Sequence, residues 1–91
     1  MRKIERTTAF KRDFKREKKT RPRVDRWLSA VVALLADDKP LREATRDHPL
    51  TGNWKDHRDC HLKPDLVLIY RKPDTQTLQL VRLGSHTELF G

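Results

Sequence analysis

Leu66-Val67-Leu68-Ile69-Tyr70 is an unbroken apolar run between two segments of turn composition. Successive side chains of a strand point to opposite faces of a sheet, so a run without polar residues is typical of a central strand that is buried on both faces. The turn segments are Lys63-Pro64-Asp65 before the run and Pro73-Asp74-Thr75 after it. We therefore predict a sheet organised around residues 66–70, with further strands at 56–62 and 77–83.

Two helices are predicted in the first half of the chain, and together they form a hairpin that covers one face of the sheet. Thr8 is a suitable N-cap for the first helix, which carries Phe10 and Phe14 on one side and ends near Lys19. Pro22 suits the first turn of the second helix. Apolar residues then recur at the spacing of a helix face that packs on a core, namely Val24, Trp27, Leu28, Val31, Leu34 and Leu35.

An edge strand at residues 2–7 completes the predicted order of elements, which is β-α-α-β-β-β. This order predicts a single α+β domain over residues 1–91, with a mostly antiparallel sheet of about four strands. Residues 39–54 form a long connector, and in a small domain such a connector is usually functional or disordered. We expect its apolar residues Leu41, Leu50 and Trp54 to hold it on the core, which argues against disorder.

The composition favours a polyanionic partner. The 91 residues carry a formal net charge of +8, and the sequence pI is about 10.2. Nucleic acid, an anionic membrane and an acidic protein are the partners that such a charge attracts, and we favour nucleic acid. The longest apolar run, Ala30–Ala36, is too short to span a membrane, and the charged N-terminus lacks a secretion signal. We expect a cytoplasmic protein, and its single cysteine, Cys60, excludes an internal disulfide.

The positive charge is concentrated between Lys11 and Arg26. This segment holds nine Lys or Arg and three Asp or Glu, so its local net charge is +6. Lys11, Lys15, Lys18 and Lys19 of the first helix are expected to contact the phosphates of a nucleic-acid backbone. Such contacts position a backbone rather than read bases, and the alternative is a solvated helix face without a partner.

All four histidines lie at or beyond position 48, among acidic and basic residues. Cleavage of RNA by attack of the ribose 2′-OH needs a base, an acid and a cation that stabilises the charge on phosphorus. His48, His61, Asp65 and His86 are candidates for the first two roles, and Arg82 is the candidate cation. His61 and Asp65 flank a tight turn, while Arg82 and His86 flank the end of the last strand. We therefore predict that these side chains converge at one edge of the sheet.

Three spaced blocks that combine His, Asp, Arg, Pro and Gly follow one another along the second half of the chain. They are Asp47-His48-Pro49-Leu50 with Gly52 and Trp54, then Arg58-Asp59-Cys60-His61 with Pro64-Asp65, then Arg82 with Gly84-Ser85-His86 and Leu89-Phe90-Gly91. Together they resemble the YafQ branch of the RelE-like toxins, and the resemblance spans essentially the whole chain. It implies the RelE-like fold and the activity of this family, whose members are ribosome-dependent mRNA endoribonucleases of type II toxin–antitoxin systems.

The resemblance also implies catalytic roles. His48, His61, Asp65 and His86 match the positions that carry catalysis in the YafQ branch. His48 and His86 would form the base–acid pair, in either order. His61 and Asp65 would tune or share the proton transfer.

Substrate contacts and partners follow from the same resemblance. Arg82 matches a basic position that contacts phosphate, and Phe90 matches an aromatic residue that helps to hold the nucleotide. The four lysines would contact ribosomal RNA while the mRNA lies on the ribosome. A toxin of this class implies a cognate acidic antitoxin, commonly with a DNA-binding domain of its own, and no membrane partner.

A non-enzymatic nucleic-acid-binding domain and an interaction module for an acidic partner are the alternatives. The clustering of His with Asp favours an enzyme, because a pure binder needs cations and aromatic groups rather than proton carriers. No metal and no cofactor are predicted, since His57 and His61 would lie about 13 Å apart on an extended strand and could not share an ion. Cys60 is expected to be buried, and Arg58 is expected to form a structural salt bridge.

Overall fold

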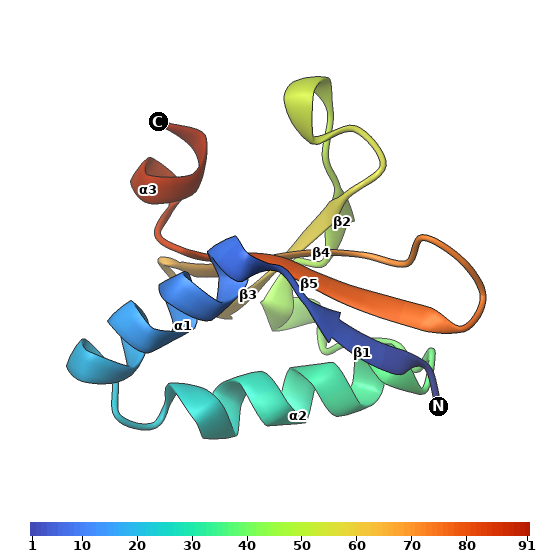
Figure 1. The fold of residues 1–91 in the computed structure, drawn as a ribbon, viewed down its shortest axis with the longest axis horizontal. Helices are drawn as coiled ribbons and strands as arrows, with labels where there is room; N and C mark the ends of the chain where they lie inside the picture. The colour runs from blue at the N-terminus through green and yellow to red at the C-terminus, as the bar shows by residue number, and fades with distance from the viewer.

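A five-stranded mixed sheet carries helices on both of its faces in the computed structural model, which describes all residues from 1 to 91 (Figure 1). The strands lie in the order β1-β5-β4-β3-β2, and β1 runs parallel to β5 while the other neighbouring pairs are antiparallel. The strands are β1 (Lys3–Arg6), β2 (His48–Pro49), β3 (Arg58–Lys63), β4 (Leu66–Arg71) and β5 (Thr77–Gly84). The helices are α1 (Thr8–Thr20), α2 (Val24–Ala36) and α3 (His86–Phe90), with single 3₁₀ turns at Glu43–Thr45 and Gly52–Trp54.

The predicted α+β class is confirmed, and the structure adds two elements to the predicted order. Within the connector, β2 forms a fifth strand, in which His48 pairs with Asp59 and Pro49 with Arg58. After β5 the chain forms a short helix, α3, where the predicted order contained no element. The sequence does not reveal β2, because two residues carry no periodicity and only the pairing with β3 makes them a strand. A membrane-spanning helix is absent, since no helix combines the length and the apolar character that a bilayer requires.

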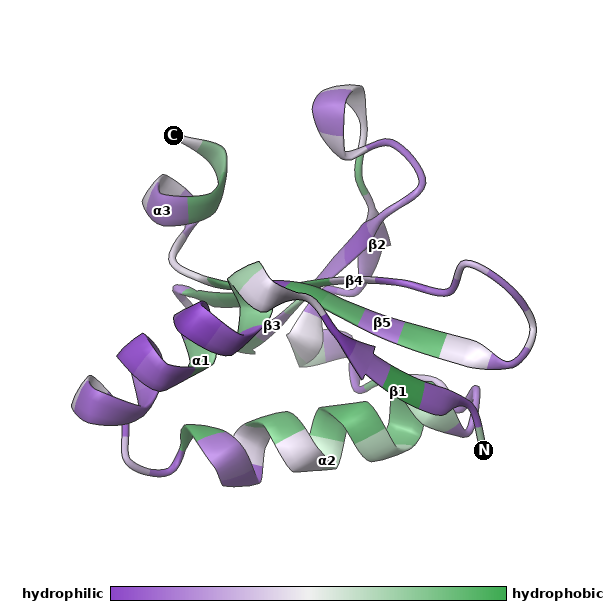
Figure 2. Ribbon diagram, in the orientation of Figure 1, coloured by the Kyte–Doolittle hydropathy of each residue, from purple (hydrophilic) through white to green (hydrophobic).

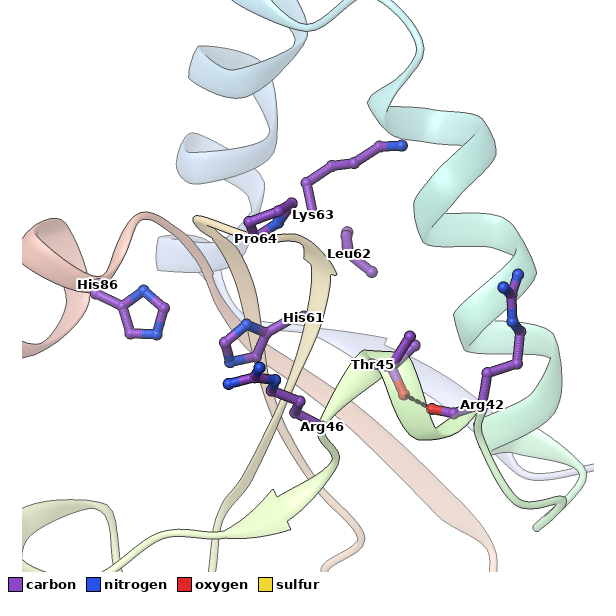
Figure 3. Close-up of a pocket in the computed structure, with 9 residues that line it drawn as sticks. Arg42, Thr45, Arg46, His61, Leu62, Lys63, Pro64 and His86 are labelled. Carbon is purple, nitrogen blue, oxygen red and sulfur yellow. Dashed lines mark hydrogen bonds between the residues drawn. The ribbon is translucent and has the colours of Figure 1, made fainter.

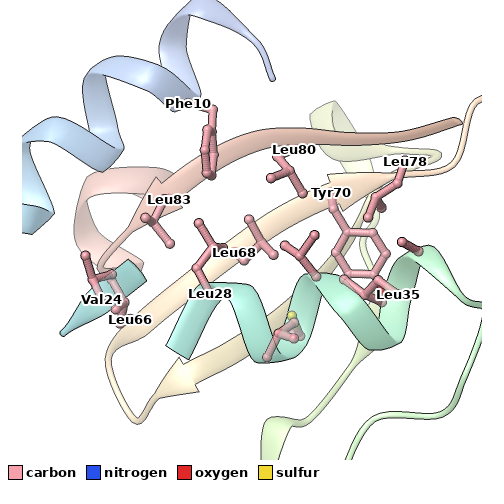
Figure 4. Close-up of a cluster of buried hydrophobic side chains, with 14 residues drawn as sticks. Phe10, Val24, Leu28, Leu35, Leu66, Leu68, Tyr70, Leu78, Leu80 and Leu83 are labelled. Atoms are coloured by element: carbon pink, nitrogen blue, oxygen red, sulfur yellow. The ribbon is translucent and has the colours of Figure 1, made fainter. Parts of the chain in front are cut away.

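β4 lies at the centre of the sheet and is buried along its whole apolar run, as predicted. Leu66, Leu68 and Tyr70 belong to the larger hydrophobic cluster, which includes residues of α1 and α2 (Figure 4). Val67 and Ile69 point to the opposite face and pack with Leu89 of α3. Burial of a large aliphatic side chain contributes roughly 1.5–3 kcal/mol, so β4 stabilises the layers on both faces of the sheet.

The two N-terminal helices begin at residues other than those predicted. Thr7, and not Thr8, is the N-cap of α1, because its Oγ1 accepts a hydrogen bond from the Phe10 N–H (3.0 Å). α2 begins at Val24, and Pro22 lies in the preceding turn rather than in the first helical turn. Arg23, the residue before α2, makes no side-chain cap bond. Sequence patterns place helix ends only to within one or two residues.

α2 closes the larger cluster. Figure 2 shows the apolar side of α2 turned towards the sheet, whereas α1 is mostly hydrophilic. Trp27 and Leu34, two members of the predicted stripe, are only partly buried, and Val32 is buried in addition. The buried stripe is therefore shifted by part of a turn from the predicted one, which is possible because a packed helix face is roughly 100° wide.

β1 pairs only with residues 77–80 of β5, and α1 covers the rest of that edge. There the Thr7 hydroxyl donates to the Val81 carbonyl (2.7 Å), and the Asp13 carboxylate accepts from the Leu83 N–H (3.0 Å). Arg16 Nη2 donates to the Leu83 carbonyl (3.1 Å). Backbone groups at a buried edge need partners, and here side chains of α1 and its cap replace a neighbouring strand.

The connector between α2 and β3 is held by side-chain contacts. Its three apolar residues pack against the two hydrophobic clusters, as predicted. Asp47 accepts hydrogen bonds from the Tyr70 hydroxyl (2.5 Å) and from Arg58 Nε (3.2 Å). The salt bridge expected for Arg58 is therefore present, and it fixes the chain one residue before His48.

Candidate active site

Asp65 holds His86 at the start of α3. The carboxylate accepts hydrogen bonds from the His86 backbone N–H (3.1 Å) and from Nδ1 of its ring (2.9 Å). Because an ionised carboxylate can only accept, the ring proton of neutral His86 lies on Nδ1, and Nε2 has a free lone pair. The hydrogen bonds from His86 lower the pKa of Asp65, which is therefore ionised at neutral pH.

A capping box builds α3 and thereby positions His86. The Ser85 hydroxyl accepts from the Glu88 N–H (3.2 Å), and the Glu88 carboxylate accepts from the Ser85 N–H (2.9 Å). Ser85 and Glu88 are three residues apart, which is a sequence signal for a helix start. Gly84 leaves room for the side chains of Arg16 and Glu88, because a Cβ there would lie 3.0 Å from Arg16 Nη2 and 3.1 Å from Glu88 Oε1.

His61 and Phe90 flank the His86 ring. The centroid of the His61 ring lies 5.0 Å from that of His86, and the Phe90 centroid lies 6.2 Å from it on α3. Phe90 is 42% exposed and does not belong to either hydrophobic cluster. The two imidazoles and the exposed phenyl ring are therefore neighbours, and a nucleobase can stack on one of their faces.

β2 places His48 beside β3 at the edge of the sheet. In the strand register His48 stands opposite Asp59. His48 Nδ1 donates to the Arg46 carbonyl (2.7 Å), and it also lies 3.0 Å from Asp59 Oδ1. A carbonyl can only accept, so the proton of the neutral ring is on Nδ1 and Nε2 is free, as it is in His86.

Asp59 is a buried acid beneath the histidines. It is 2% exposed, and its Oδ1 has no hydrogen-bond partner despite the nearby His48 ring. Burial raises the pKa of Asp59, and positive charge on His48, His61 and His86 opposes the rise. All three histidines therefore act electrostatically on one carboxylate. The only sequence signal for this role is the strand alternation that places Asp59 on the same face as His61.

Replacing Asp59 by asparagine is expected to raise the melting temperature at neutral pH by a few degrees. The raised pKa means that the folded protein binds this proton more tightly than the unfolded chain does, so ionised Asp59 opposes folding. Lowering the pH through the raised pKa protonates the wild-type residue and should remove the difference between the two proteins. Thermal unfolding at neutral and at acid pH measures this, and a gain that is independent of pH would contradict it.

Arg82 lies on the same face of the sheet as His48 and Asp59, but its guanidinium is bound to Asp13 of α1. The strand registers place His48, Asp59, Ile69 and Arg82 in one row across β2, β3, β4 and β5. At ~4.8 Å per strand, the backbone of Arg82 is about 10 Å from that of Asp59. The Arg82 guanidinium donates to the Asp13 carboxylate through Nε (2.6 Å) and Nη2 (3.2 Å). Only Nη1 is left without a protein acceptor.

A cleft of about 600 Å³ opens beside His61 and His86 (Figure 3). It lies along the part of β3 that β2 leaves uncovered. Arg42, Arg46 and Lys63 also line it, and no acidic residue does. The structure therefore brings His61 and His86 together at one edge of the sheet. His48 does not line the cleft, but it is close enough to Asp59 to act on the same buried carboxylate as the other two rings.

The four lysines predicted to contact phosphate, here called the α1 lysines (Lys11, Lys15, Lys18 and Lys19), are all exposed. The two acids of α1, Asp13 and Glu17, are buried and do not reduce the positive charge of the exposed surface. Lys18 is paired with Asp25 of α2 (2.9 Å), so its charge is partly neutralised. The remaining lysines present a basic surface to solvent.

His57 lies outside this group of residues. It precedes β3, which begins at Arg58, so the strand alternation that would place it with His61 does not extend to it. Its ring packs against Trp54, with the centroids 5.3 Å apart.

The structure contains no group of three or more His, Cys, Asp or Glu side chains that is arranged to hold a metal ion. Cys60 is fully buried, and burial raises the pKa of its thiol to about 12. A buried protonated thiol is unreactive, so Cys60 is part of the core.

Comparison with known proteins decides the family. The sequence model for the bacterial toxin of type II toxin–antitoxin systems, YafQ, matches residues 2–91. The chain belongs to the YafQ toxin family. One relative in this family is the mRNA interferase toxin YafQ of Escherichia coli strain K12, which is 36% identical over 88 residues that cover 97% of this chain and 95% of the E. coli protein.

Solved structures show the same fold. A metal-bound toxin from Helicobacter pylori is 48% identical, covers 99% of this chain and 100% of its own, and has a TM-score of 0.90. YafQ in the E. coli DinJ–YafQ complex is 36% identical over the full length of both chains and has a TM-score of 0.88. The arrangement of three helices on a five-stranded mixed sheet is thus the YafQ-family fold.

Proposed function

We propose that this YafQ-family toxin is a ribosome-dependent endoribonuclease that cuts mRNA and thereby inhibits translation. The E. coli relative, an mRNA interferase toxin, supports this class of activity. The observation in this chain that carries the proposal is the His86 imidazole, which is oriented by Asp65 and lies beside His61. These rings stand at a cleft with a cationic lining, which suits a phosphodiester substrate.

The proposed reaction is attack of a ribose 2′-OH on the adjacent phosphorus. One ring of the pair His48 and His86 takes the 2′-OH proton through its free Nε2, and the other, protonated, gives a proton to the departing 5′-oxygen. The O2′–P bond forms as the P–O5′ bond breaks, which yields a 2′,3′-cyclic phosphate and a free 5′-OH. Both rings suit this exchange because an acceptor fixes the Nδ1 proton of each.

The remaining residues support the transfer. Asp65 orients His86 and fixes the ring proton on Nδ1, as a carboxylate does for the histidine of a catalytic triad. His61 shares or tunes the proton transfer from a ring distance of 5.0 Å. Phe90 provides a stacking surface for a base, and Arg82 approaches the phosphate through Nη1.

Reversing the charge of all four α1 lysines is expected to weaken ribosome binding at least tenfold at physiological salt. Each lost phosphate contact should also reduce the slope of log K against log salt by roughly 0.7–0.9. Cleavage of mRNA that is already bound should persist. Reversal of Lys39 and Lys55 is the control, and an unchanged slope in the α1 variant would mean that α1 is only a solvated surface.

A cognate antitoxin is the second proposed partner. E. coli YafQ forms a complex with DinJ. With a net charge of +8, this chain would attract an acidic antitoxin that folds on binding, and we propose that the antitoxin carries a DNA-binding domain of its own.

Mapping of mRNA 5′ ends after induction of the protein tests the proposed function. Cuts in register with the reading frame, which disappear when translation initiation is blocked, would support both cleavage and ribosome dependence. Intact mRNA at full expression would exclude the activity, and cuts that ignore the reading frame would exclude ribosome dependence.

The proposed reaction uses no metal ion, and this needs its own test because the H. pylori toxin is metal-bound. Cleavage on purified ribosomes is expected to continue with phenanthroline, which removes zinc and copper but leaves the ribosomal Mg²⁺ in place. Loss of cleavage that returns on addition of zinc or copper would assign the metal a part in the reaction.

A further inference from the structure

Arg46 has an unusual backbone conformation at the cleft. Its φ of 50° and ψ of 45° lie in the left-handed region, which Gly and Asn adopt more easily than Arg. Two hydrogen bonds hold it there: its N–H donates to the Glu43 carbonyl (3.0 Å), and its carbonyl accepts from His48 Nδ1 (2.7 Å). Strained residues cluster at functional sites, so the presence of an arginine here calls for a role of its side chain.

The Arg46 side chain lies beside His61 and has no partner in the protein. Figure 3 shows its guanidinium next to the His61 ring in the cleft that both residues line. Arg46 forms no ion pair, and the acids of this region are engaged elsewhere. The Asp47 carboxylate is bonded to side chains of β3 and β4, and Asp65 is bonded to His86. An exposed guanidinium without a carboxylate is available to an anionic ligand.

The rest of the cleft has the same sign of charge. Arg42 and Lys63 line it with Arg46, and the lining contains no carboxylate. Lys63 Nζ lies 4.4 Å above the Trp27 ring of α2, so this cation lies on the α2 side of the cleft, away from His61. A cleft lined by cations and free of acids attracts anions. The volume of this cleft, about 600 Å³, leaves room for more than a phosphate group.

We propose that Arg46 binds a phosphate of the RNA strand in this cleft, next to His61 and His86. A planar guanidinium can donate two parallel hydrogen bonds to two phosphate oxygens. The inference rests on the proposed function for the identity of the ligand as RNA. Arg46 is better placed for this contact than Arg82, whose guanidinium is engaged by the buried Asp13.

Titration of inorganic phosphate into the free protein tests the anion site directly. NMR signals of Arg46 Nε–H and of the His61 and His86 rings are expected to shift saturably. Arg46→Gln should abolish these shifts while the backbone bond to His48 remains, because that bond uses the Arg46 carbonyl. Arg6→Gln is the matched control, since it removes the same charge from β1 at the opposite edge of the sheet.

Kinetics on mRNA-programmed ribosomes give the second readout. Arg46→Gln is expected to lower kcat/KM about 10- to 100-fold, the effect of losing a charged hydrogen bond to substrate. Arg46→Lys should recover part of the loss, because an ammonium binds phosphate as a point charge without the two parallel bonds. The melting temperatures of both variants should match the wild type, since the side chain has no protein partner.

Phosphate-induced shifts that persist in Arg46→Gln, or that move to Arg82, would overturn the assignment. An equal fall in kcat/KM in Arg6→Gln would do the same, because the effect would then be one of net charge alone. If the wild-type protein binds phosphate at Arg46 and cuts no mRNA, the proposed function fails while the anion site stands.

Discussion

His86→Ala is expected to lower mRNA cleavage by roughly 10²–10⁴-fold, the usual contribution of one general acid or base, and so to abolish growth arrest. The substitution removes the ring and leaves the backbone N–H that donates to Asp65. The side chain is 49% exposed, so little packing is lost and the fold should persist. Single-turnover cleavage on programmed ribosomes, together with the melting temperature, separates the two effects.

His57→Ala is the matched control for this experiment. It also removes an imidazole, but one that packs on Trp54 away from the cleft. Cleavage by this variant should stay within a small factor of the wild type. An equal loss in both variants would mean that the boundary of the site is drawn wrongly. A toxic His86→Ala protein with a lower melting temperature would mean that the ring only stabilises α3.

Asp13→Ala is expected to destabilise the protein by about 1.5–3 kcal/mol, the usual contribution of hydrogen bonds to a charged group. Asp13 is 3% exposed and accepts hydrogen bonds from Arg82, Arg16 and the Leu83 N–H. Its loss leaves the buried Leu83 N–H without an acceptor, whereas the partly exposed guanidinium groups of Arg82 and Arg16 can turn to water. A chain of 91 residues has a total stability of about 5–14 kcal/mol, so chemical denaturation should measure the loss clearly.

Acid unfolding provides an independent readout of the same ion pair. Burial by itself would raise the pKa of Asp13, but bonds from Arg82 and the Leu83 N–H, together with the charge of Arg16, outweigh it and lower the pKa. The stabilisation is therefore complete above the ordinary value of 3.8 and is lost as the pH falls through the lower folded value. The gap in stability between wild type and variant should narrow over that range. Asp25→Ala, which removes an exposed acid, is the control, and an equal effect of the two would contradict this account.

The layers of the fold were predictable because they depend on local patterns. The apolar run at 66–70 can be buried on both faces only in a central strand, and the stripe on α2 can be buried only against the sheet. The two-residue strand β2 and the short helix α3 were missed. β2 exists only through its pairing with β3, and α3 depends on a capping box whose sequence signal, Ser85 with Glu88, is brief.

The site was predictable where its residues are close in sequence or match the blocks of the YafQ family. The turn between β3 and β4 keeps Asp65 near His61, and the structure adds the bond from Asp65 to His86, 21 residues away. The roles of these residues remain proposals. The sequence does not show whether Phe90 is buried, and the packing of α3 leaves it exposed beside His86.

The sequence by itself determined the family, the central strand, the amphipathic helices and the set of candidate histidines, because each of these is written in residue identity and spacing. Only the tertiary structure decided which charges meet. It pairs Arg82 with Asp13, 69 residues away, buries Asp59 beneath three histidines, and leaves Arg46 without a partner in the cleft. The physical reason is that a charge is neutralised, buried or free according to strand register and helix docking, which join distant segments and leave no periodicity in the sequence around any one of them.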